Sequence, residues 1–186
     1  MVDFTFHTKD SAPEESKPLL EKAESGFGFV PNILAGMAEA PALLEGYMTL
    51  SGIFDKTSFT PAERQLILLT VSYENECHFC VAAHTGGAKR AEMDDKHIEA
   101  LRNGQPLDDP KLEALRGFTK KVVTGRGWIE DSDVQKLLDA GYDKQNVLEV
   151  IVGVGLKTMS NYTNHIIGTP LNEQLEPLKW DKPKAA

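Results

Sequence analysis

Helix start and stop signals recur along this 186-residue chain, and strict two-residue alternation of apolar side chains appears nowhere over a useful length. In the clearest start signal, Thr60 can cap a helix, Pro61 suits its first position and Glu63 can complete a capping box. Because strands with one buried face need the alternation that is missing, the sequence predicts an all-α fold of eight or nine helices.

The expected helices are bounded by proline, glycine and acidic residues. The first four cover residues 13–24, a short apolar stretch that ends at residue 38, residues 41–54 and a segment that starts at residue 60. The others cover residues 77–90, 94–103, 110–124, 131–140 and 147–167. Gly153 and Gly155 lower the helix propensity of the last segment, which predicts close approach of another helix there. After Pro170 we expect a short helix or coil with Trp180 docked on the core.

Charge and length restrict the class of protein. The formal net charge is −8, and the basic residues are scattered, so neither a nucleic acid nor an anionic membrane surface is an expected partner. No segment approaches the roughly 20 apolar residues that span a bilayer, and residues 1–7 do not resemble a signal peptide. These features predict a cytoplasmic protein with a single domain over residues 1–186.

The only two cysteines form a C-x-x-C pair, Cys77 and Cys80, followed one turn later by His84. A rotation of about 100° per residue places these three side chains within about 60° on one helix face, with His78 directed elsewhere. The positive end of a helix stabilises a thiolate, and an imidazole beside Cys80 can accept its proton. The pattern therefore predicts a helical thiol peroxidase or disulfide reductase.

Metal binding is the main alternative chemistry. Cys77, Cys80 and His84 are three ligands that suit zinc, but a structural site needs four, and His7 and His97 are remote in sequence, as is the histidine at position 165. No dinucleotide or nucleoside triphosphate motif is present. We therefore expect no metal and no cofactor, and a zinc-binding helical interaction module remains the non-enzymatic alternative.

The Cys-x-x-Cys-x-x-x-His motif, together with residues 28–32 upstream and 161–165 downstream, resembles the carboxymuconolactone decarboxylase/alkylhydroperoxidase D superfamily, in particular its peroxidase-related members. The resemblance covers residues 27–172. It implies an AhpD-like helical bundle, a homo-oligomer, and reduction of a small hydroperoxide with electrons from an external thiol reductant, either a protein or a small dithiol. The decarboxylases of the superfamily lack this cysteine pair, so a muconolactone substrate is not expected.

The resemblance also implies roles for individual residues. Cys80 corresponds to the peroxidatic cysteine, Cys77 to the resolving cysteine that closes a Cys77–Cys80 disulfide, and His84 to the proton-relay histidine. A general protein disulfide oxidoreductase of the same superfamily is the alternative enzyme.

One position departs from the family pattern. The relay glutamate of the family lies twelve residues before the first cysteine, where this chain has Gln65. Glu63 and Glu74 are nearby carboxylates that could replace it through water, although Glu63 also fits the capping box. Asn161 and Asn164 share one helix face and are expected to bridge helices more than to act in the site.

Overall fold

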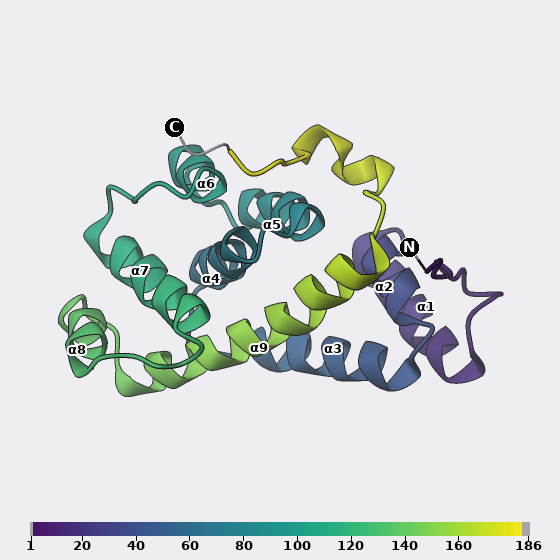
Figure 1. Cartoon of the computed structure of the whole chain (residues 1–186), viewed down its shortest axis with the longest axis horizontal. Helices are drawn as coiled ribbons and strands as arrows, with labels where there is room; N and C mark the ends of the chain where they lie inside the picture. The colour runs from purple at the N-terminus through teal and green to yellow at the C-terminus, as the bar shows by residue number, and fades with distance from the viewer. Residues whose placement is uncertain (1, 184–186) are drawn as a thin grey trace.

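The computed structural model describes residues 2–183, which form nine α-helices and two short 3-10 helices without any strand (Figure 1). The predicted all-α class is confirmed. The elements are η1 (Glu14–Ser16), α1 (Lys17–Phe27), α2 (Asn32–Met37), α3 (Pro41–Phe54), α4 (Pro61–Glu74), α5 (His78–Arg90), α6 (Asp95–Arg102), α7 (Pro110–Thr124), α8 (Asp131–Asp139), α9 (Lys144–Ile167) and η2 (Glu173–Leu178).

Local signals set most helix boundaries. The capping box before α4 is formed as predicted: the Thr60 hydroxyl accepts from the Glu63 amide at 3.2 Å, and Glu63 accepts from the Thr60 amide at 2.9 Å. Helices α3 and α7 have the predicted bounds, and each has a proline in its first turn. The first helix differs, because it begins as a 3-10 turn and continues to Phe27, where Gly28 ends it with φ +79°.

Helix α9 is the longest element and runs across the molecule (Figure 1). Helix α3 lies along it, α7 and α8 lie at one end, and α1 and α2 lie at the other. Helix α4 packs against α5, α7 and α9 and supplies the centre of the larger apolar core. A second, smaller core joins α1–α3 to the start of α5, and both cysteines belong to it. The cysteine pair therefore lies where the N-terminal helices meet the rest of the fold.

The close approach predicted at the glycines of α9 holds at one of them. A methyl group on Gly153 would lie 2.8 Å from Ile67 Cγ2 and 3.0 Å from the Phe54 ring, so only glycine fits there without movement. At Gly155 the nearest such contact, to Leu50 Cδ2, is an ordinary 3.9 Å. Gly153 thus lets α9 lie directly against α4 and the end of α3.

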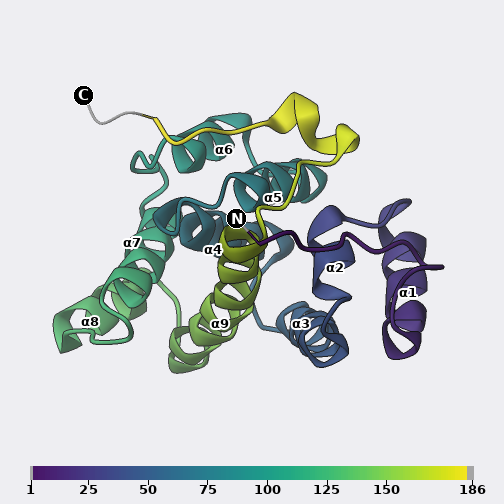
Figure 2. The ribbon, with the colours of Figure 1, turned by 45° about the vertical axis from the view of Figure 1, so that its right-hand side comes forward.

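The C-terminal segment docks on the core as expected. It passes over α5 toward α6, and η2 packs against α5 (Figure 2). Trp180 is buried and its Nε1 donates to the Arg102 carbonyl at 2.7 Å. Within residues 2–183, no helix is both long and apolar enough to cross a membrane.

Candidate active site

The α4–α5 connection places both cysteines at the N-terminus of α5. Glu76 turns the chain with φ +54°, and the Cys77 amide then donates to the Ser72 carbonyl at 2.9 Å. Cys77 is the N-cap residue, one position earlier than a first-turn residue, and Cys80 lies in the first turn. Both are free thiols and are nearly inaccessible, at 0% and 3% exposure. The unpaired amides of a helix N-terminus favour negative charge on sulfur here.

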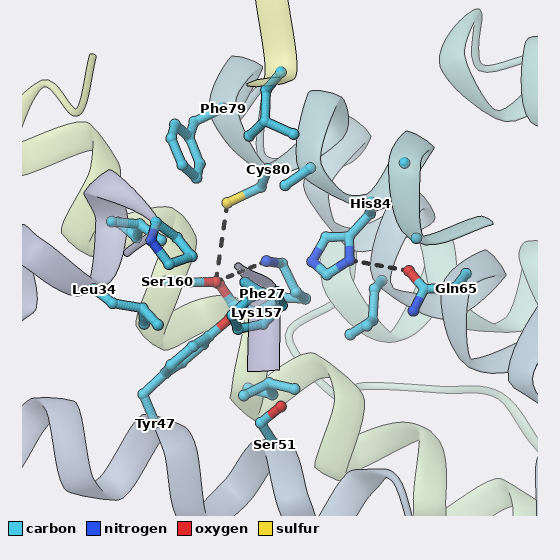
Figure 3. Close-up of a pocket in the computed structure, with 18 of the residues that line it drawn as sticks. Phe27, Leu34, Tyr47, Ser51, Gln65, Phe79, Cys80, His84, Lys157 and Ser160 are labelled. Carbon is cyan, nitrogen blue, oxygen red and sulfur yellow. Dashed lines mark hydrogen bonds between the residues drawn. The ribbon is translucent and has the colours of Figure 1, made fainter. Parts of the chain in front are cut away.

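A cavity of about 540 Å³ opens beside Cys80, between the N-terminal helices and helices α4, α5 and α9 (Figure 3). Cys80 and His84 line it, whereas Cys77 lies behind the wall. Most of the remaining wall is apolar and comes from α1–α3, α5 and the C-terminal segment: Phe27, Phe29, Leu34, Met48, Phe79, Leu175 and Leu178. The two thiols therefore differ in access, because only Cys80 meets a molecule that enters the cavity.

Lys157 is a polar wall residue that the sequence analysis did not single out. It projects from the middle of α9, is only 1% exposed, and its Nζ donates to Ser160 Oγ at 2.8 Å. The same Ser160 oxygen lies 4.0 Å from Cys80 Sγ, and Tyr47 of α3 completes the polar group (Figure 3). The available signal was that Lys157 is the one lysine or arginine within the apolar segment 147–167.

The surroundings of Cys80 favour its thiolate. Burial raises the pKa of the Cys80 thiol, but a hydrogen bond from Cys77 and the charge of Lys157 lower it more, to about 5. A further donor, the Asn161 amide, also lowers this pKa. Cys77 shows the opposite behaviour, because its hydrogen bond to Cys80 and its burial raise its pKa above the ordinary value. The pKa values of the two thiols thus shift in opposite directions, that of the accessible Cys80 downward and that of the inner Cys77 upward.

His84 is bound to Gln65 rather than to Cys80. The imidazole Nδ1 lies 3.1 Å from Gln65 Oε1, and the other ring nitrogen faces the part of the cavity that holds Lys157 and Ser160 (Figure 3). Burial, followed by the charges of Lys157 and Arg90, lowers the pKa of His84 well below its usual value. The ring is therefore neutral at pH 7, with Nδ1 protonated and Nε2 free to accept. It contributes no positive charge to the thiolate.

Of the three candidate relay residues, only Gln65 lies at the cavity. Glu63 is occupied elsewhere, since it accepts from Thr60 and also from the Tyr142 hydroxyl at 2.8 Å. Glu74 pairs with Lys120 at 3.2 Å. Neither carboxylate lines the cavity.

Asn161 combines a structural contact with a contact to the site. Its Oδ1 accepts from Asn75 at 2.9 Å, which ties α9 to the end of α4. Its Nδ2 is buried without a hydrogen-bond partner and is near enough to Cys80 to lower the pKa of that thiol. Asn164 is also buried but does not line the cavity. Within residues 2–183, no three histidine, cysteine or acidic side chains gather into a possible metal site.

Solved structures with the same fold include three that match this chain almost end to end. A peroxidase-related protein with an alkylhydroperoxidase AhpD core from Ralstonia eutropha JMP134 gives a TM-score of 0.81 at 19% identity, with 92% of this chain and 93% of that chain covered. A peroxidase-related protein from Silicibacter sp. TM1040 gives 0.79 at 21% identity, with coverage of 94% and 92%. The debrominase Bmp8, in complex with 2,3,4-tribromopyrrole, gives 0.79 at 16% identity, with coverage of 96% and 95%.

The chain therefore has the helical fold of these AhpD-core and peroxidase-related proteins. Residues 41–121, which include both cysteines and His84, match the sequence pattern of the carboxymuconolactone decarboxylase family. The family resemblance inferred from the motif is confirmed by this match and by the shared fold. No curated protein sequence matches the chain.

Proposed function

We propose that this protein is a thiol-dependent hydroperoxide reductase in which Cys80 is the peroxidatic cysteine and Cys77 the resolving one. One observation carries the proposal: a thiol with a lowered pKa, that of Cys80, lines a mostly apolar cavity, and the fully buried thiol of Cys77 belongs to the N-cap residue of the same helix, three residues earlier. The family match and the peroxidase-related proteins of the same fold are consistent with this chemistry.

The proposed cycle has three balanced steps. The Cys80 thiolate attacks the terminal oxygen of a hydroperoxide, so that an S–O bond forms, the O–O bond breaks and the departing alkoxide takes up one proton to become an alcohol. Cys77 then attacks the sulfur of the sulfenic acid, which closes the disulfide and releases water. An external dithiol reduces that disulfide by exchange and is itself oxidised to a disulfide. The cycle requires no metal and no organic cofactor.

His84 can act as the proton relay of this cycle. Its Nε2 can accept a hydrogen bond from the terminal hydroxyl of the hydroperoxide and thereby direct that oxygen toward Cys80. The bond to Gln65 holds the ring in the tautomer that this needs. In the reductive step the same nitrogen can take the proton of the incoming reductant thiol.

The cavity supports a small organic hydroperoxide as the substrate. A volume of about 540 Å³ with largely apolar walls suits an organic group attached to the peroxide. Cys80 and Cys77 are 3% and 0% exposed, which favours a small oxidant over the disulfide of a folded protein.

The burial of both cysteines restricts the reductant in the same way. It is therefore a small dithiol, or a thiol on a narrow extended segment of a protein. A reducing compartment such as the cytoplasm would sustain the cycle.

The proposal is tested by adding limiting cumene hydroperoxide to the reduced protein and measuring its native mass. For each hydroperoxide consumed we expect one alcohol formed and one chain that has lost two hydrogen atoms, with a Cys77–Cys80 disulfide in its peptide map. An unchanged thiol content would contradict peroxide reduction, and bound zinc would favour the interaction module. The same measurement with 2,3,4-tribromopyrrole, the ligand of the debrominase with this fold, tests whether the thiolate prefers a halogenated substrate.

A further inference from the structure

Lys157 is a buried ammonium group without a carboxylate partner. Its side chain is 1% exposed, and its Nζ donates a hydrogen bond to the neutral Ser160 hydroxyl at 2.8 Å. Among residues 2–183, no Asp or Glu oxygen lies within 4.0 Å of its Nζ. Burial of an unpaired ammonium is unfavourable, so a lysine in such a place either loses its proton or pairs with another anion.

Three acidic groups are close enough to be that anion: the Tyr47 phenol and the thiols of Cys80 and Cys77. The hydrogen bond to Cys80 and burial raise the pKa of Cys77, so that thiol keeps its proton. The phenol keeps its proton, because burial raises the pKa of Tyr47 above its ordinary value. Cys80 is the better acid, because it lies at the positive end of α5 and its neighbours Cys77 and Asn161 lower the pKa of its thiol. The anion beside Lys157 is therefore the Cys80 thiolate.

We propose that Lys157 is the counter-ion of the Cys80 thiolate and, in the proposed peroxide reduction, the donor of the proton that the leaving alkoxide takes up. The second part rests on the proposed function, whereas the first part does not. The ammonium and the thiolate attract each other across a cavity wall that water barely reaches, where a charge pair is stronger than in solvent.

The attack itself would prompt the proton transfer. When the thiolate becomes a neutral sulfenic acid, Lys157 loses its anionic partner while its burial is unchanged, so its pKa falls. The alkoxide that forms at the same moment is a strong base and takes that proton. The products are a sulfenic acid, an alcohol and a neutral amine, so the buried charges disappear together. After the disulfide is reduced, the Cys80 thiol returns a proton to the amine, which restores the ion pair.

Other titratable groups around the pair do not replace Lys157. On α5, Cys77 keeps its proton and His84 is neutral. Arg90, also on α5, is exposed to solvent at the edge of the cavity. Asp55, directly after α3, lines the outer cavity and lies 4.0 Å from Arg64. Helix α4 contributes the neutral Gln65. Lys157 is thus the buried cation of the site.

The test separates the two roles of Lys157 by substitution. Lys157→Met removes the charge and the proton donor, whereas Lys157→Arg keeps a charge that cannot be released as a proton at any ordinary pH. Lys144→Met, on the exposed first turn of the same helix, is the matched control. Thiolate formation is measured from the pH dependence of alkylation by iodoacetamide and of absorbance at the thiolate band. Hydroperoxide reduction is measured separately by stopped flow.

We expect Lys157→Met to move the alkylation midpoint of Cys80 toward that of an ordinary thiol, about 8.5, which lowers the alkylation rate about 100-fold at a pH two units below that value. Lys157→Arg should keep a low alkylation midpoint, but its rate of hydroperoxide reduction should be about 10²–10⁴-fold lower than that of the wild type. Lys144→Met should behave as the wild type. If Lys157→Met does not fold, as judged by circular dichroism, Lys157→Gln is titrated in its place.

An unchanged alkylation midpoint in the folded neutral variant would overturn the counter-ion role. A low midpoint with an unchanged peroxide rate in Lys157→Arg would overturn the proton-donor role. The alkylation experiment needs no peroxide, so a protein that fails to reduce hydroperoxides but shows the expected midpoint shift would refute only the proposed function.

Discussion

His84 and Gln65 are joined through Nδ1 and Oε1 at 3.1 Å, and this bond fixes the tautomer of the histidine. A carboxylate in place of the amide would draw a second proton onto the ring, because an adjacent negative charge stabilises the imidazolium. Here burial lowers the pKa of His84, and the amide oxygen does not counteract it. In the proposed mechanism the site therefore separates two tasks: the neutral His84 positions protons, while the buried Lys157 supplies the charge.

Gln65→Glu should raise the pKa of His84 and either raise the rate of hydroperoxide reduction or leave it unchanged. The new carboxylate would accept from Nδ1 and favour the imidazolium, which adds a second cation near Cys80. Titration of the ring protons by NMR reports the pKa, and stopped-flow kinetics report the rate. A slower enzyme with an unshifted His84 pKa would contradict this role of position 65.

His84→Ala should slow hydroperoxide reduction by about 10²–10⁴-fold, the usual worth of a positioned acid or base. Its effect on Cys80 should be small, because the neutral ring carries no charge that could lower the pKa of the thiol. The alkylation midpoint should therefore stay near the wild-type pKa of about 5. A midpoint that rises toward 8.5, the ordinary thiol value, would instead show that a protonated His84 activates the thiol. An unchanged rate of hydroperoxide reduction in this variant would show that His84 has only a structural role.

Cys80→Ser should abolish hydroperoxide turnover, whereas Cys77→Ser should permit one sulfenic acid per chain and then stop. The reason is access, since Cys80 lines the cavity and Cys77 lies behind it. A sulfenic-acid probe followed by peptide mass analysis distinguishes the two variants. The reverse result, with sulfenic acid on Cys77 in Cys80→Ser, would exchange the two assigned roles.

Glu63→Ala should destabilise the protein by about 1–3 kcal/mol at neutral pH, because it removes the capping box and leaves the buried Tyr142 hydroxyl without its acceptor. Burial raises the pKa of Glu63, but its hydrogen bonds to Thr60 and Tyr142 lower it more. A carboxyl with a lowered pKa stabilises the fold above its unfolded pKa, so the difference from wild type should shrink as the pH falls through the folded value. Thermal unfolding at several pH values measures this. A changed Cys80 alkylation profile would reveal a relay role for Glu63.

We propose that the protein is a homo-oligomer. The outer face of α9 carries four exposed apolar side chains at helical spacing, Leu148, Ile151, Tyr162 and Ile166, which are 70%, 51%, 56% and 64% exposed. Light scattering should give a mass above 20.5 kDa, and Ile151→Glu should lower it. Trp128→Glu, which replaces a side chain that is 89% exposed outside α9, is the control and should leave the mass unchanged. A wild-type monomer at micromolar concentration would contradict the proposal.

The sequence alone determined the helical class, most helix boundaries and the location of the reactive segment. These features depend on short-range interactions: Thr60 and Glu63 are three residues apart, and Cys77 and Cys80 share one turn at the start of α5. Caps, prolines and helical spacing act within a few residues and can be read directly from the chain. The sequence also predicted that Trp180 docks on the core, because a single large apolar residue in a polar tail is expected to be buried.

The tertiary structure alone decided which polar groups surround Cys80. Lys157 lies 77 positions from Cys80 in sequence, and although it is the one lysine or arginine of its apolar segment, no local pattern connects it to the cysteines. The packing of α9 against α5 brings it to the sulfur, and the same packing makes His84 neutral by burial. The protonation state of a buried group depends on the groups around it, and the packing of helices, rather than the local sequence, determines which groups those are.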